Sequence, residues 1–69
     1  MQMHDVVALT CDVPDDGLRR GQVGTVVEMW AHGVYEVEFA DLDGRAYAFA
    51  AVPEDALMPL LFRAQERAA

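Results

Sequence analysis

The stretch TVVEMWAHGVYEVEFADLDGRAYAFAAV, residues 25–52, decides the fold. It contains three runs rich in β-branched and aromatic residues, over 25–30, 34–39 and 45–52, and short glycine-containing segments separate them. Runs of this length and composition are typical of β-strands. Residues 25–52 are therefore predicted to form three antiparallel strands joined by two hairpins.

Each hairpin is predicted to have a three-residue loop that ends in glycine, Gly33 in the first and Gly44 in the second. Glycine at the third position readily adopts the left-handed conformation needed for a type I turn followed by a G1 bulge. In the first hairpin this register also separates core residues from charged ones, whereas a two-residue loop mixes them. In the second hairpin a two-residue type I′ turn at Asp43-Gly44 stays open, because Asp-Gly is a favoured pair for that turn.

These registers assign one face of the three strands to the core and the other to solvent. The predicted core face carries Thr25, Val27, Met29, Tyr35, Val37, Phe39, Tyr47, Phe49 and Ala51. The predicted outer face carries Val26, Glu28, Trp30, Val34, Glu36, Glu38, Ala48, Ala50 and Val52. A solvated sheet face is usually polar, so an apolar one beside three glutamates predicts a protein-binding surface. The alternative is that the C-terminal segment covers it.

The sequence before residue 25 predicts a first strand over residues 5–9, DVVAL, followed by a long irregular loop. Pro14, paired aspartates and Gly17 punctuate this loop. Gly21 and Gly24 mark the turn into the second strand. Cys11, near the end of the first strand, is expected to be a small buried thiol.

The sequence after residue 52 predicts one helical turn over 53–56, with proline at its first position, and a short last strand at 57–58. The predicted fold is therefore an all-β, five-stranded SH3-like barrel over residues 1–60. Residues 61–69 are expected to form a tail that is helical or frayed, because so short a helix is marginal unless Leu61 or Phe62 docks.

A family resemblance rests on residues spread over 18–60: Leu18, Gly21, GTVV at 24–27, YEVEF at 35–39, Asp43-Gly44 and LMP at 57–59. Together they resemble a family of short bacterial SH3-like barrel proteins, domain of unknown function 4926. More distantly, residues 21–27 are similar to KOW-type barrels and to barrels in accessory subunits of nitrile hydratase-like enzymes. The resemblance implies the fold, but it supplies no catalytic residue to carry over.

Composition narrows the functional classes. The chain has 69 residues, a formal net charge of −7, one cysteine, and neither lysine nor serine. A chain this short forms one domain with an economical core. The acidic charge disfavours nucleic acid and anionic membranes as partners, and the missing residue types remove lysine- and serine-based catalysis. With no signal peptide or apolar span in its sequence, the chain is expected to be cytoplasmic.

The candidate metal ligands are dispersed, which predicts no metal or other cofactor: His4, Asp5, Glu28, His32 and Glu36. The chain is therefore predicted to be a non-catalytic protein-binding or adaptor module that self-associates or pairs with a second small bacterial protein. Two alternatives stay open. The first is an accessory barrel subunit of a larger metalloenzyme complex, and the second is a nucleic-acid-binding KOW-like barrel, which the net charge disfavours.

Overall fold

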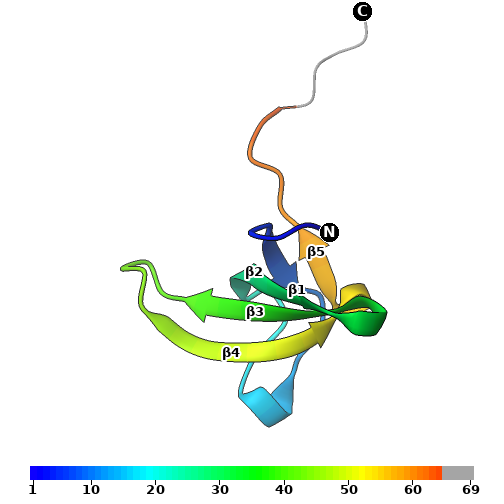
Figure 1. Ribbon diagram of the computed structural model, residues 1–69. Coiled ribbons are helices and arrows are strands. Elements are labelled where there is room, and N and C mark those ends of the chain that lie inside the picture. The colour runs from blue at the N-terminus through cyan, green and yellow to red at the C-terminus, as the bar shows by residue number, and fades with distance from the viewer. Residues whose placement is uncertain (65–69) are drawn as a thin grey trace, which may run out of the picture.

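The computed structural model describes residues 1–64, which form one antiparallel sheet of five strands (Figure 1). The strands are β1 (Val6–Leu9), β2 (Val23–Trp30), β3 (Val34–Ala40), β4 (Ala46–Pro53) and β5 (Leu57–Pro59). Three short 3-10 turns accompany them: η1 (Pro14–Asp16), η2 (Ala31–Gly33) and η3 (Glu54–Ala56). The predicted all-β class, the five strands and the helical turn before the last strand are confirmed.

Strand β2 connects the two halves of the sheet, whose order is β4-β3-β2-β1-β5. Residues 23–25 lie opposite β1, while residues 24–30 lie opposite β3. In Figure 1, β3 and β4 run side by side, and β1 and β5 run steeply across their direction. The sheet thereby curls into a small barrel with its core on the inner face.

The turn between β2 and β3 has the predicted length, because Trp30 lies opposite Val34. Gly33 has a φ of 73°, as predicted for a glycine that closes this loop. His32 also lies in the left-handed region, with a φ of 66°. A type I turn places this residue at a φ of about −90°, so the predicted turn type is wrong although the loop length is right. A non-glycine residue pays roughly 1–2 kcal/mol for that conformation, so this turn holds more backbone strain than expected.

The turn between β3 and β4 is held by one aspartate. Oδ1 of Asp41 accepts hydrogen bonds from the backbone N–H of Asp43 (2.9 Å) and of Arg45 (3.0 Å). The backbone N–H of Asp41 donates to the carbonyl of Arg45 at 2.9 Å, and Gly44 has a φ of 82°. Asp43 is not in the left-handed region that a type I′ turn would need. The three-residue loop is therefore confirmed over the two-residue alternative.

Beyond each turn, a β-bulge shifts the register by one residue. In the first hairpin Glu28 still lies opposite Glu36, but Val26 lies opposite Val37, so Val27 is the extra residue. Because side chains alternate along a strand, one extra residue exchanges the two faces beyond it. Val26 is therefore fully buried, and the prediction that it lies on the outer face is wrong.

The second bulge has a larger consequence, because it exchanges the faces along nearly all of β4. Ala40 lies opposite Ala46, as the three-residue turn requires, but Phe39 lies opposite Ala48, which leaves Tyr47 as the extra residue. Ala50 and Val52 consequently point into the core, while Phe49 and Ala51 are exposed. The predicted faces of β4 are thus inverted from residue 48 onward.

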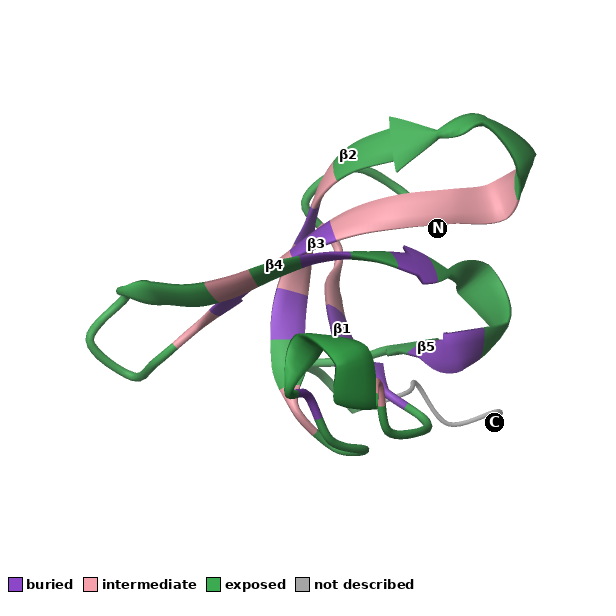
Figure 2. Cartoon of the chain, turned by 90° about the horizontal axis from the view of Figure 1, so that it is seen from below, coloured by how far each residue is buried: buried purple, intermediate pink, exposed green. Residues whose placement is uncertain are grey.

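The core lies inside the curled sheet, where Figure 2 shows the buried segments of the strands facing one another. Strand β3 faces it as predicted, with Val37 and Phe39 fully buried. The other buried hydrophobic residues come from every strand, the long loop and η3: Val7, Leu9, Leu18, Val26, Ala50, Val52, Ala56 and Leu57. Half-exposed Tyr47 lies at the edge of this core, its ring centroid 6.4 Å from that of Phe39.

The loop between β1 and β2 is more ordered than its composition suggests. The backbones of Val13 and Leu18 exchange two hydrogen bonds, of 2.8 and 3.0 Å, around η1, and Leu18 is buried in the core. Cys11 in the same loop is exposed, so the expectation of a buried thiol is wrong. It lies beyond the end of β1, where the chain has left the sheet.

The part of the tail that is described does not cover the sheet. Leu61 and Phe62 are both largely exposed, and the chain leads away from β5 in Figure 1. Residues 60–64 contain no helix, which removes the helical alternative for that part. The rest of the predicted tail, residues 65–69, lies outside the described residues.

Candidate interaction surface

The bulges create an outer sheet face, which we define as the side chains of β2, β3 and β4 that point away from the core. Strand registers arrange them in three rows, each with one residue from β2, β3 and β4 in that order: Trp30–Val34–Pro53, Glu28–Glu36–Ala51 and Thr25–Glu38–Phe49. The core rows alternate with these: Met29–Tyr35–Val52, Val26–Val37–Ala50 and Gly24–Phe39–Ala48. Side chains directly opposite on neighbouring strands share one face, so each row is a contiguous strip of surface.

Trp30 dominates the first row of the outer sheet face. Its side chain is 53% exposed although it is the largest in the chain, and Nε1 of the indole donates a hydrogen bond to Oε1 of Glu36 at 3.2 Å. Val34 beside it is half-buried and Pro53 is exposed. The bond to Glu36 fixes the polar edge of the indole, so its apolar face is presented to solvent in one orientation.

Phe49 is a second exposed aromatic on this face, so the prediction that it belongs to the core is wrong. It is 56% exposed, with Ala51 two residues further along β4 and Glu38 opposite on β3. Its position follows from the bulge at Tyr47, which leaves no mark in the pattern of apolar residues. The sequence therefore contains no signal that Phe49 is exposed.

Five of the nine predicted partner-binding residues lie on the outer sheet face, and four do not. Trp30, Val34, Glu28, Glu36 and Glu38 are brought together there, as predicted. The other four point inward: Val26, Val52 and Ala50 are 0%, 1% and 4% exposed, and half-buried Ala48 packs against the core. The predicted surface is therefore corrected by removing these four residues and adding Phe49, Ala51 and Pro53.

The charges on the outer sheet face are all negative. Glu28 and Glu36 lie in the row between the two exposed aromatics, and Glu38 lies beside Phe49. The strands β2, β3 and β4 contain no lysine or arginine. Carboxylates on such a surface repel acidic partners and attract basic ones. The face can therefore make apolar contacts through its aromatics while it discriminates by charge.

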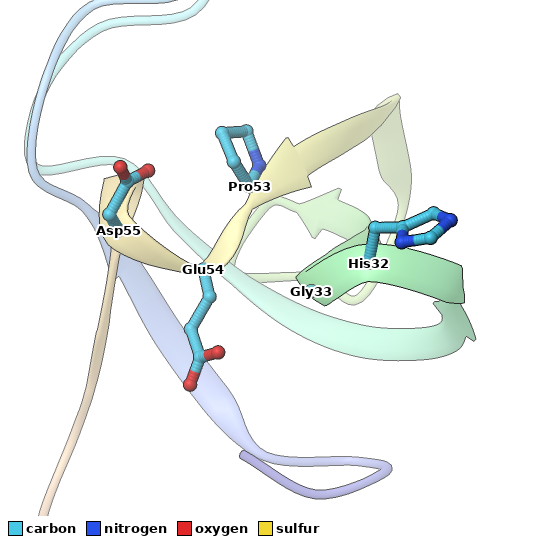
Figure 3. A pocket seen from close by; sticks show the side chains of 5 residues that line it. All are labelled: His32, Gly33, Pro53, Glu54 and Asp55. Atoms are coloured by element: carbon cyan, nitrogen blue, oxygen red, sulfur yellow. The ribbon is translucent and has the colours of Figure 1, made fainter.

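A shallow hollow lies beside this face, where η2 approaches the end of β4 (Figure 3). It is lined by His32, Gly33, Pro53, Glu54 and Asp55, and the side chains of the histidine and the two acids point in different directions. Within residues 1–64, no three side chains of histidine, cysteine, aspartate or glutamate form a group suited to a metal ion. The hollow therefore offers no converging set of ligands.

The predicted turn glycines occupy two kinds of position. Gly21, Gly33 and Gly44 have positive φ angles. Gly24 is instead needed for space, because a Cβ atom there would lie 2.5 Å from Cγ1 of Val37 and 2.8 Å from the carbonyl oxygen of Glu38. Contacts this short force a neighbour to move. Gly24 thus lets β2 lie close against the large side chains of β3.

No curated protein and no solved structure matches the chain. The described residues contain no helix with the length and apolar character needed to cross a bilayer. Residues 3–59, most of the chain, match the family described as Domain of unknown function (DUF4926), and the chain belongs to this family.

Proposed function

We propose that the chain is a non-catalytic protein-binding or adaptor module of the bacterial cytoplasm, and that the outer sheet face is its binding surface. The observation that carries the proposal is the pair of half-exposed aromatics, Trp30 and Phe49, on one face of a sheet whose core is filled by other residues. Exposed apolar patches with a polar rim are characteristic of interaction sites.

Trp30 is suited to act as the anchor of the contact. Tryptophan is among the residues that most often dominate binding energy, because its large apolar area is removed from water on binding. Its hydrogen bond to Glu36 already restricts the indole, so less conformational freedom is lost when a partner binds. Ala51, in the row between Trp30 and Phe49, leaves room for a partner to approach the backbone of β4.

The acidic residues on the same face define the partner by its charge. Glu28, Glu36 and Glu38 favour a protein surface that brings arginine or lysine side chains around an apolar centre, and they disfavour an acidic one. Recognition of this kind is non-covalent and needs no cofactor. The fixed aromatics provide area, and the carboxylates provide selectivity.

The test is to capture the partner from the binding surface itself. A photo-crosslinking amino acid is introduced at position 28 in the native host, because exposed Glu28 lies on the same face in the row next to Trp30 and its replacement leaves the anchor in place. A second chain that carries the crosslinker at position 42 is the control. Leu42 is fully exposed at the tip of the β3–β4 turn, so it samples proteins that meet any exposed apolar residue. A protein captured from position 28 and not from position 42 is then purified for titration.

Trp30→Ala is expected to raise the dissociation constant for that protein by at least about ten-fold, since truncation of a central aromatic anchor removes a large share of binding energy. Leu42→Ala, the matched control, is expected to change it by less than about two-fold. Circular dichroism should show both variants folded. Unchanged affinity in Trp30→Ala would contradict the proposal, and unfolding of this variant would instead place Trp30 among the residues that hold the fold.

A further inference from the structure

The strand β4 lies at one edge of the sheet. One side of it pairs with β3, and no strand of the described part of the chain pairs with the other. Such an edge presents unpaired N–H and C=O groups that can pair with another strand. A bulge at Tyr47 and a proline at Pro53 interrupt the two ends, but the stretch between them, residues 48–52, carries neither. This central stretch is therefore available for strand pairing.

The free edge of β4 carries no charge along its length. The strand has the sequence AYAFAAVP, without a charged residue, in a chain whose formal charge is −7. Arg45 immediately precedes it and Glu54 immediately follows it. At about 3.3 Å per residue these two side chains are roughly 30 Å apart along one strand, too far to interact within one copy. The edge is thus neutral in its centre. One end carries the cation Arg45 beside the turn carboxylates Asp41 and Asp43, and the other end carries the two acids Glu54 and Asp55.

We propose that two copies of the chain pair in antiparallel fashion along the free edge of β4 to form a homodimer. This inference extends the proposed protein-binding function to self-association, and it uses the strand edge rather than the outer sheet face. Antiparallel pairing brings the first residue of one β4 close to the last residue of the other. Arg45 of each copy then approaches the acidic end of the other β4, at Glu54 and Asp55. The charge complementarity of the edge is this attraction between one cation and two carboxylates.

The symmetry of this antiparallel arrangement limits the assembly to two copies. An antiparallel pair of identical strands has a two-fold axis perpendicular to the sheet, so the contact is used once by each copy and growth stops at the dimer. With pairing centred on residues 48–52, the exposed Phe49 side chains of the two copies lie near the axis. The axis also leaves both outer sheet faces on the same side, so the dimer presents two copies of Trp30 in parallel.

The opposite edge of the sheet is a poorer site for a second copy. Strand β5 has three residues and ends in Pro59, which lacks an N–H group. Pairing of β4 with β5 of another copy would therefore be short, and it would leave an open β4 and β5 at the ends of the assembly. That arrangement gives rings or filaments, which distinguishes it from the dimer.

The test exchanges the two charges at the ends of β4. Arg45→Glu and Glu54→Arg each replace attraction by repulsion at two symmetric contacts, and the double variant restores opposite charges. Sedimentation equilibrium is used to measure the dimer dissociation constant of all three. Each single variant is expected to raise it by about ten-fold, and the double variant to return it to within about three-fold of the original.

The three variants distinguish a general effect of net charge from local attraction between Arg45 and Glu54, because the two explanations predict opposite changes in the dimer dissociation constant for Glu54→Arg. Arg45→Glu makes each chain two charges more negative, Glu54→Arg makes it two charges less negative, and the double variant returns to −7. General repulsion predicts a tighter dimer for Glu54→Arg, whereas the proposed pairing predicts a weaker one. Arg63→Glu, in the segment that leads away from β5, has the same net charge as Arg45→Glu and is expected to leave the dimer nearly unchanged.

Several results would overturn the inference: a wild-type chain that stays monomeric at every concentration, an assembly larger than a dimer, or a double variant that dimerises no more tightly than the single ones.

Amide hydrogen exchange provides a second measurement, since protection over residues 48–52 should rise with concentration. Trp30→Ala is expected to leave the dimer intact while it weakens partner binding. Loss of the dimer with partner binding preserved therefore contradicts only this inference, and the reverse contradicts only the proposed function.

Discussion

The strands β3 and β4 pair along most of their lengths but place their phenylalanines on opposite faces of the sheet. On β3, Val37 and Phe39 are fully buried, and the glutamates point outward. On β4, Ala50 fills an inward position, while Phe49 is exposed. Strand β3 therefore provides most of the volume of the core at this point, and β4 covers it with smaller residues. The comparison indicates that Phe49 contributes less to the core than Phe39 does.

The largest expected effect separates the two phenylalanines. Phe39→Ala removes a fully buried aromatic and is expected to lower the free energy of unfolding by about 3–5 kcal/mol. Phe49→Ala is expected to lower it by no more than about 0.5 kcal/mol, because the side chain is exposed. Urea denaturation followed by far-ultraviolet circular dichroism measures both. Equal losses in the two variants would show that β4 and β3 share the core, contrary to the comparison.

A smaller effect is expected on the opposite side of Phe39, at Gly24 of β2. The row Gly24–Phe39–Ala48 places the large residue of β3 between two small ones. Gly24→Ala adds a Cβ atom 2.5 Å from Val37, so the free energy of unfolding should fall by about 1–3 kcal/mol. Thr25→Ala, the neighbouring substitution on the outer sheet face, is the control. A Gly24→Ala variant as stable as the original would mean that β2 does not lie close to β3.

The hairpin turns fix the register on which the comparison depends, and their effect is smaller again. Gly33→Val and Gly44→Val force a β-branched residue into the left-handed region, at φ of 73° and 82°. Each is expected to cost about 1–2 kcal/mol of unfolding free energy in chemical denaturation. Neutral behaviour of both variants would show that neither turn has the conformation described.

The lengths of the turns could be predicted from the sequence because they depend on particular residues. Gly33 and Gly44 occupy positions where other residues are strained, and both strand runs end beside them. The pairing of β3 with both β2 and β4 and the identity of the inward face of β3 followed from the same pattern. Trp30 and the three glutamates were placed correctly on the outer sheet face, because Trp30, Glu28 and Glu36 lie on the turn side of the first bulge and Glu38 follows the alternation of β3.

The bulges could not be predicted, because no required residue type marks them. Val26 and Val27 are both apolar, so a slip between them leaves the pattern of β2 unchanged. The alternation of small and aromatic residues in β4 is equally compatible with either face, since alanine is found both in cores and on surfaces. The preference for aromatic residues inside then favoured Phe49 over Ala50, and this was wrong. Which face of β4 points inward depends on how it packs in the core. That core also contains Val7 and Leu9 of β1, which are distant from β4 in the sequence.

The central claim is that β4 turns Ala50 toward the core and Ala51 toward solvent, and two neighbouring substitutions test it most directly. Ala50→Arg should abolish cooperative folding, because it forces an unpaired charge into a site that is 4% exposed. Ala51→Arg should change the free energy of unfolding by no more than about 0.5 kcal/mol, because this residue is exposed opposite Glu36. A folded Ala50→Arg variant together with an unfolded Ala51→Arg variant would contradict the claim and return Phe49 to the core.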